Sequence, residues 1–140
     1  MEARLALASA LSPQEARMLS PLQLAYVGDS VHALLTRTHL MGKNLPVRDM
    51  HAAANRQLSA VAQARELQRL LPLLTEEEMD IVRRGRNAHP HHAAPKSATA
   101  EEYAGATGLE ALLGYLYLTG RADRLAHLSA HLQSEEENHG

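Results

Sequence analysis

The 140-residue sequence contains no cysteine, no phenylalanine and no tryptophan. The absence of cysteine excludes disulfide frameworks, cysteine zinc sites and thiol catalysis. No apolar run approaches the roughly 18 residues that a membrane span needs, and the N-terminus lacks a signal-peptide pattern. The sequence therefore predicts a soluble cytoplasmic protein, with a core built from Leu, Ala, Val, Met and four tyrosines.

A basic excess is also missing. The formal net charge of −2 is not typical of a nucleic-acid-binding protein. The charges are unevenly distributed, however. Acidic residues fill positions 76–78 and 135–137, and Arg83, Arg84 and Arg86 form a basic cluster. The net charge is therefore a poor guide to any one face of the molecule.

Residues with high helix propensity dominate the composition, and start and stop signals divide them into helices. Ser-Pro pairs at 12–13 and 20–21 and threonines at 75 and 99 are typical helix starts. Gly42 and Gly120 are typical residues after a helix end, and Pro72 ends a long Ala- and Leu-rich stretch over about 47–71. The sequence predicts one all-α domain over residues 1–140, with about six or seven helices and a frayed tail at 135–140.

Two predicted helices each contain one carboxylate among apolar or small residues. On a helical wheel, Asp29 shares a mostly apolar face, which we expect to be turned away from solvent, with Leu22, Ala25, Ala33, Thr36 and Leu40. Glu110 has Ala106, Thr107, Leu113 and Gly114 as neighbours one turn away. If the two helices pack together, the paired carboxylates would bind a divalent cation, and Mg²⁺ suits a site with few carboxylates. The alternative is that each acid is structural, bonded to an arginine, a tyrosine or a helix N-terminus.

A single long loop, NAHPHHAAPKSATA, separates the basic cluster from the helix that contains Glu110. Loops of this size in small domains are often functional. Its histidines, at positions 89, 91 and 92, have no acid or cysteine close in sequence. We therefore favour a solvated loop, or histidines near phosphates, over a metal site.

Three motifs in this order resemble the ribonuclease III family: YVGDSV (26–31), RRGRNAHPHHAAPKSATAEEY (83–103) and TGLEALLGYLYL (107–118). The middle motif is similar to the Mini-ribonuclease III subgroup, which has the catalytic domain without the double-stranded-RNA-binding domain. The resemblance covers about residues 17–128, and the chain ends where an appended binding domain would start.

The resemblance implies that Asp29 and Glu110 are the catalytic residues and ligands of Mg²⁺, with Mn²⁺ as a substitute. Full-length members of the family have a glutamate where this chain has Ala25 and an aspartate where it has Thr107. Fewer carboxylates predict weaker metal binding and leave open whether one or two ions act. Thr107, one turn before Glu110, is a candidate for contact with a metal-bound water.

The family's activity is cleavage of both strands of an RNA duplex by a homodimer, leaving 5′-phosphate and 3′-hydroxyl ends. The subgroup resemblance implies the 23S ribosomal RNA precursor as substrate. In the family the helix that contains Gly28 contributes to the dimer interface, so Gly28 serves either close approach there or ordinary packing within the chain. The expected RNA-binding residues are Arg83, Arg84, Arg86, Asn87 and Lys96, although arginines in a last helical turn also complement the helix dipole.

Two other classes of function remain open from the sequence. One is a non-catalytic RNA-binding or ribosome-assembly protein on the same helical scaffold, which is favoured if the reduced acidic site no longer holds a metal. The other is a helical dimerisation module with no role in RNA metabolism. Cleavage of an RNA duplex that is abolished by Asp29→Asn distinguishes the enzyme from both.

Overall fold

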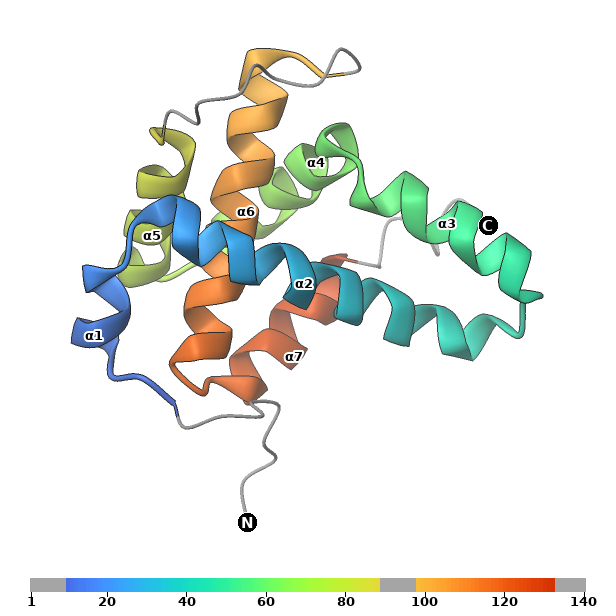
Figure 1. Ribbon diagram of the computed structural model, residues 1–140, viewed down its shortest axis with the longest axis horizontal. Helices are drawn as coiled ribbons and strands as arrows, with labels where there is room; N and C mark the ends of the chain where they lie inside the picture. Colours follow the sequence, from blue (N-terminus) through green and yellow to red (C-terminus); the bar gives the residue numbers. More distant parts are fainter. Residues whose placement is uncertain (1–9, 89–97, 133–140) are drawn as a thin grey trace.

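The computed structural model describes residues 10–88 and 98–132, and within these ranges it contains only helices and their connections. The elements are α1 (Pro13–Met18), α2 (Pro21–Leu40), η1 (Met41–Lys43), α3 (Val47–Leu58), α4 (Ala60–Leu70), η2 (Leu71–Leu73), α5 (Glu76–Arg86), α6 (Ala100–Leu118) and α7 (Ala122–Leu132), where η denotes a 3₁₀ turn (Figure 1). The predicted all-α fold class is therefore confirmed. None of the helices in the described ranges is long and apolar enough to cross a membrane.

Four helices begin at the hydroxyl residues that the sequence predicts. Ser12, Ser20, Thr75 and Thr99 each accept a hydrogen bond from the backbone N–H three residues later, at 3.0–3.2 Å. The Glu or Gln at that position bonds back to the N–H of the cap residue, which completes a capping box. Two otherwise unpaired donors are thereby satisfied at each helix start.

Two boundaries differ from the sequence pattern. The stretch over 47–71 is divided at Ser59, which ends α3 with an extended backbone and starts α4 by accepting a hydrogen bond from the N–H of Ala62 at 3.2 Å. Gly42 does not take the left-handed conformation expected after a helix end. The chain tightens into η1 instead, and Asn44 adopts the positive φ of 50°, as asparagine often does. Gly120 does take it, with φ 73°.

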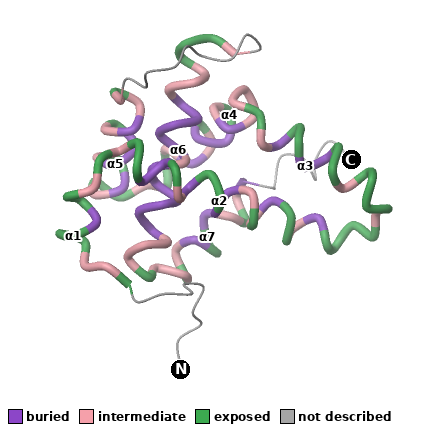
Figure 2. The backbone as a smooth tube through the Cα atoms, viewed as in Figure 1, coloured by how far each residue is buried: buried purple, intermediate pink, exposed green. Residues whose placement is uncertain are grey.

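Helix α6 lies at the centre of the fold, and its residues from Gly105 to Leu116 are almost all buried. It is apolar on all sides, as expected for a helix surrounded by others. Helices α2, α4 and α5 pack around it, and α2 crosses it (Figure 1). The buried segments gather along this axis (Figure 2), with Leu24, Leu67, Ile81, Leu112 and Leu128 joining five helices in one core.

The second half of α2 extends beyond this core together with α3 (Figure 1). A small separate cluster of Leu40, Ala53, Ala54 and Leu58 holds these two helices together. The predicted frayed tail at 135–140 and the histidine-rich loop lie outside the described residues.

Candidate active site

Helices α2 and α6 approach each other so closely at their crossing that only glycine fits at the contact. A Cβ atom built on Gly28 would lie 1.6 Å from the carbonyl oxygen of Glu110, and one built on Gly114 would lie 2.0 Å from the carbonyl oxygen of Leu24. Real Cβ atoms do not approach other atoms so closely. Of the two explanations that the sequence left open for Gly28, packing within the chain is therefore the one the structure shows.

This crossing brings together the two carboxylates that the sequence singled out. Asp29 follows Gly28 on α2, and its side chain forms a hydrogen bond with the side chain of Glu110 on α6. Burial, this hydrogen bond and the charge of Asp29 raise the pKa of Glu110 to about 8, and a hydrogen bond from Gln63 opposes the rise. Near neutral pH Glu110 is therefore mostly protonated, and a cation that bound there would displace its proton.

The expected burial of Asp29 is wrong. Asp29 is exposed and Glu110 is partly buried. The helical wheel identified a mostly apolar face, but only one stripe of α2 packs on α6, so other residues on the Asp29 side are exposed as well. Tyr26 is 83% exposed and Leu22 is 37% exposed. The acid pair consequently lies at the surface, where a hydrated cation and a substrate can reach it.

The donor set fits a divalent cation better than it fits a structural ion pair. The groups that act on the Glu110 carboxyl are Asp29 and Gln63, and no arginine is among them. Carboxylate oxygens are the ligands that Mg²⁺ prefers, with water filling the other positions. Within the described ranges no group of three or more His, Cys, Asp or Glu side chains is placed to hold a metal. A cation here would therefore keep most of its waters.

The two positions that differ from full-length ribonucleases III lie close in sequence to the acids but add no charge. Ala25 is buried one turn before Asp29. The hydroxyl of Thr107 donates to the carbonyl oxygen of Tyr103 at 3.0 Å, in its own helix. Its hydrogen is therefore already used, and only its lone pairs remain for a metal-bound water. The contact of Thr107 with such a water stays a prediction.

Three polar residues behind the acid pair were missed by sequence reasoning. Gln63 and Glu66, one turn apart on α4, are buried together with His32 of α2. The amide nitrogen of Gln63 lies 3.5 Å from a carboxylate oxygen of Glu110, and His32 bonds to Glu66 at 2.8 Å. The sequence signal for these three residues is weak, because polar residues at helical spacing occur on exposed helix faces as well.

The predicted RNA-binding residues are divided between two places. Two adjoining hollows lie among α4, α5 and the start of α6, and they share Gln68 and Arg86. We refer to them as the α4–α6 groove, whose polar side chains are Arg65, Gln68, Arg83, Arg86, Asn87, Thr99, Glu101 and Glu102. Sequence reasoning missed Arg65, because only the packing of α4 on α6 places it beside the basic end of α5.

Arg84 points away from this groove. Its guanidinium donates to the backbone carbonyls of Arg17 at 3.3 Å and Leu19 at 3.1 Å, at the end of α1. Within the groove, Arg86 pairs loosely with Glu101 at 3.7 Å, and Arg83 forms an exposed ion pair with Asp80. Lys96 lies outside the described residues. RNA contact stays a prediction for all five expected residues: Arg83, Arg84, Arg86, Asn87 and Lys96.

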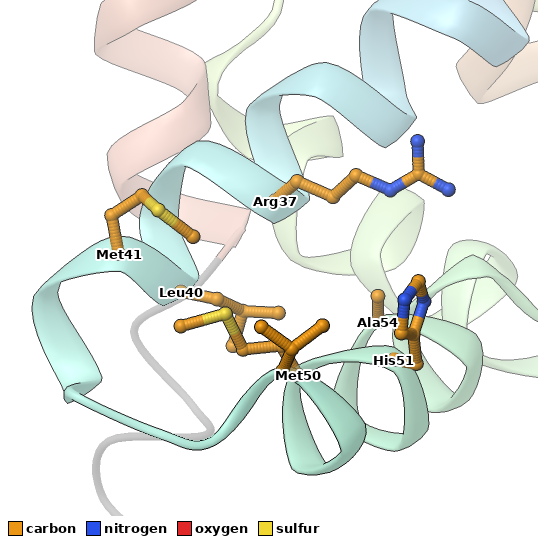
Figure 3. A pocket seen from close by; sticks show the side chains of 7 residues that line it. Arg37, Leu40, Met41, Met50, His51 and Ala54 are labelled. Atoms are coloured by element: carbon orange, nitrogen blue, oxygen red, sulfur yellow. The ribbon is translucent and has the colours of Figure 1, made fainter.

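A further pocket lies at the far end of α2, between this helix and α3 (Figure 3). Its lining is mostly apolar, with the side chains of Leu40, Met41 and Met50 on one side and those of Arg37 and His51 on the other. Its lining contains no carboxylate, the ligand that Mg²⁺ prefers. The acid pair and the α4–α6 groove are therefore the better candidates for the functional surface.

Comparison with known proteins assigns the chain to a family. Residues 22–121 match the Ribonuclease III domain. The chain therefore belongs to the ribonuclease III family, and it is an endoribonuclease.

Curated relatives of the chain are named Mini-ribonuclease 3. The protein of this name from Symbiobacterium thermophilum is 51% identical over 111 residues, which cover 79% of this chain and 85% of that protein. The one from Thermoanaerobacter sp. is 48% identical over 111 residues, covering 79% of this chain and 78% of that protein. A crystal structure of a Fusobacterium nucleatum protein has a TM-score of 0.77 and 25% identity, covering 87% of this chain and 98% of that chain.

Proposed function

We propose that the chain cleaves double-stranded RNA in a reaction that depends on Mg²⁺, with Asp29 and Glu110 as catalytic metal ligands. The observation that supports this most is the closeness of the two carboxyl groups: burial, and next to it the Asp29 carboxyl group, raise the pKa of Glu110 to about 8. Two carboxyl groups in such contact are destabilised unless a proton or a cation lies between them. Mn²⁺ is expected to substitute for Mg²⁺, because both accept the same oxygen ligands.

In the proposed reaction, water attacks the phosphorus atom, and the bond from phosphorus to the 3′ oxygen breaks, leaving a 5′-phosphate and a 3′-hydroxyl. Asp29 and Glu110 would hold the Mg²⁺ ion, which would lower the pKa of a water and neutralise charge on the phosphate. The protein positions the two carboxyl groups for this reaction. The α2–α6 crossing fixes Glu110, while Asp29 is exposed on the surface where RNA would bind. Glu110 must lose its proton to act as a ligand, so we expect the active form to have both carboxylates charged.

The α4–α6 groove is the proposed contact for the RNA backbone. Duplex RNA is recognised mainly through phosphates and 2′-hydroxyls, which arginine and amide side chains bind well. Arg83 and Asn87 are exposed, and Arg65 is exposed on the neighbouring helix. The ion pair of Arg83 is exposed and that of Arg86 is long, so both guanidinium groups keep N–H donors for phosphate. Arg84 and Lys96 stay predictions at this interface.

We also propose a homodimer, in which each copy cuts one strand. Leu22 and Tyr26 lie one turn apart on α2, and Tyr26 is 83% exposed although it is aromatic. Asp29 follows within the next turn, so an interface over Leu22 and Tyr26 would set each acid pair at the edge of the dimer. An isologous dimer matches the local two-fold symmetry of a duplex. Tyr26→Glu is expected to give monomers in analytical ultracentrifugation, whereas Met41→Glu, which changes another exposed apolar residue just beyond the far end of α2, leaves the dimer intact.

The proposed cellular substrate is the precursor of 23S ribosomal RNA, acted on in the cytoplasm. This part of the proposal depends on the resemblance to Mini-ribonuclease III proteins. A transcript containing the paired ends of that precursor is expected to be cut at fixed positions, whereas a generic duplex of equal length is cut at scattered positions. Equal cutting of both substrates would argue against this assignment.

The central experiment incubates the protein with an RNA duplex and Mg²⁺, beside Asp29→Asn and Glu110→Gln variants. Metal ligation contributes several kcal/mol to the transition state, so each variant is expected to lose about 10³-fold in rate or more. Single-stranded RNA and duplex DNA are the substrate controls. Binding without cleavage by the wild-type protein would instead favour a non-catalytic RNA-binding protein, and neither binding nor cleavage would favour a dimerisation module.

A further inference from the structure

A chain of buried polar side chains leads from the core to the proposed catalytic pair. The Nε2 atom of His32 lies 2.8 Å from Oε2 of Glu66, and Nδ1 of His32 lies 3.5 Å from the amide nitrogen of Gln63. That nitrogen also lies 3.5 Å from Oε2 of Glu110 and 3.3 Å from the carbonyl oxygen of Leu58. His32 is 0% exposed, Gln63 2% and Glu66 4%.

The directions of these hydrogen bonds follow from the tautomer of His32. In the tautomer that donates from Nε2 to Glu66, Nδ1 is an acceptor. The amide nitrogen of Gln63 therefore faces three acceptors: His32 Nδ1, the Leu58 carbonyl and the Glu110 carboxylate. The opposite amide orientation would set its oxygen against the oxygens of Leu58 and Glu110, which is repulsive.

In this orientation of the Gln63 amide, its own oxygen, Oε1, is buried and has no hydrogen-bond partner among the described residues. Leaving a buried acceptor unsatisfied costs about 1–3 kcal/mol. An amide that served only to fill the core would be replaced without loss by an apolar side chain of the same length. The direction of its N–H group is therefore the feature that explains a glutamine here.

We propose that Gln63 is a positioning residue for Glu110: His32 and the Leu58 carbonyl orient its amide, and its N–H group holds the Glu110 carboxylate ready to bind the metal. The hydrogen bond from Gln63 also acts to lower the pKa of Glu110, in opposition to burial and Asp29. Partners that orient metal ligands in this way usually contribute 10–100-fold to metal affinity or activity. This inference rests on the proposed function of Glu110 as a metal ligand.

The test is the dissociation constant of Mn²⁺, measured by electron paramagnetic resonance without RNA, for the wild-type protein and for Gln63→Met. The substitution keeps the length of the side chain and replaces its amide with an apolar thioether. We expect about a tenfold weaker affinity for Mn²⁺. In cleavage assays the Mg²⁺ concentration for half-maximal rate should rise similarly, while the rate at saturating Mg²⁺ stays within about threefold of wild type.

Thr36→Val is the matched control, since Thr36 is buried one turn beyond His32 on α2 and its hydroxyl has no hydrogen-bond partner among the described residues. It tests whether any polar-to-apolar change in this part of the core alters metal binding, and we expect wild-type affinity. A wild-type Mn²⁺ affinity in a folded Gln63→Met protein would overturn the proposal. So would an equal loss of affinity in Thr36→Val.

A second measurement needs no change at Gln63. The side-chain amide signal of Gln63 in the ¹⁵N NMR spectrum of the wild-type protein should shift on addition of Mg²⁺, with the same dissociation constant as metal binding. In Glu110→Gln the shift should disappear, and its persistence there would overturn the proposal. Because both readouts report metal binding without RNA, they are independent of whether the wild-type protein cleaves a duplex.

Discussion

Arg124 of α7 binds the buried carboxylate of Glu78 of α5 through two nitrogens, at 2.8 and 2.7 Å. Glu78 is 2% exposed, and the same guanidinium donates to the carbonyl oxygen of Leu73 at 2.8 Å. Burial raises the pKa of Glu78, but the hydrogen bonds from Arg124 and from Thr75 outweigh it, so the pKa lies below its ordinary value. This contact attaches the last described helix to the core.

We therefore predict that Arg124→Met destabilises the fold by on the order of 3 kcal/mol, because it leaves a buried carboxylate unpaired. The free energy of unfolding in urea at pH 7 is the measurement. Arg83→Met removes an exposed ion pair with Asp80 and serves as the control, with an expected cost below about 1 kcal/mol. Equal costs for the two variants would contradict the prediction.

Acid should remove the same contribution. A carboxylate whose pKa is lower in the folded than in the unfolded chain stabilises the fold above the unfolded pKa, and this stabilisation is lost as pH falls through the folded pKa. Glu77, whose pKa is lowered by Arg121 and Tyr115, acts in the same direction. Unfolding free energies measured downward from pH 6 should therefore fall less steeply in Arg124→Met than in the wild-type protein.

The α2–α6 crossing allows a sharper prediction about glycine. Gly28→Ala would drive a methyl group into the backbone of Glu110, so the two helices must separate. We expect a cost at or above the upper end of the roughly 1–3 kcal/mol typical of overpacking, with loss of cleavage because Asp29 moves from Glu110. Gly42→Ala is the control, since nothing lies within 4 Å of the added atom. Its melting temperature should be that of wild type, and a similar drop in both variants would refute the argument.

The proton held by Glu110 predicts how metal binding depends on pH. Its pKa of about 8 lies above the ordinary 4.5, so its contribution to stability without metal is fully present below about pH 4.5 and is lost as pH rises through 8. A metal ligated by Glu110 would need the charged form and would therefore displace this proton at pH 7. Calorimetric titration with Mg²⁺ in buffers of different ionisation enthalpy should show release of up to one proton at pH 7 and little at pH 9. An affinity independent of pH over this range would contradict the prediction.

The sequence was sufficient to predict the parts of this fold that depend on local chemistry. Capping residues define helix starts within one turn of chain, and Ser12, Ser20, Thr75 and Thr99 all act as predicted. Ser59 belongs to the same class of residue, but no proline or change of composition marks the break there. Similarly, Gly42 and Asn44 are both able to adopt a left-handed backbone, and only the path into α3 decides between them.

Contacts between helices were harder to predict. The pairing of Asp29 with Glu110 followed from two similar motifs, but the exposure of Asp29 depends on which stripe of α2 faces α6, and that is set by the Gly28 contact. Arg84 and Arg86 are two residues apart, so they project from different sides of α5, and only the packed structure shows that one meets α1 and the other lines the groove. Gln63 reaches the Glu110 carboxyl group only because α4 packs against α6.

The α4–α6 groove yields a prediction about duplex binding. If the Arg86 guanidinium contacts a phosphate, Arg86→Gln should weaken binding of all duplex sequences alike and reduce the slope of log affinity against log salt by nearly one unit. Arg65→Gln should do the same, because Arg65 lines the same hollow as Arg86. Arg37→Gln removes an exposed arginine from the pocket at the far end of α2 and should leave the slope unchanged. Fluorescence anisotropy in Ca²⁺ between 50 and 200 mM salt, a range chosen for its large effect on phosphate contacts, measures all three. Equal slopes for the Arg86 and Arg37 variants would indicate that RNA binds another face of the protein.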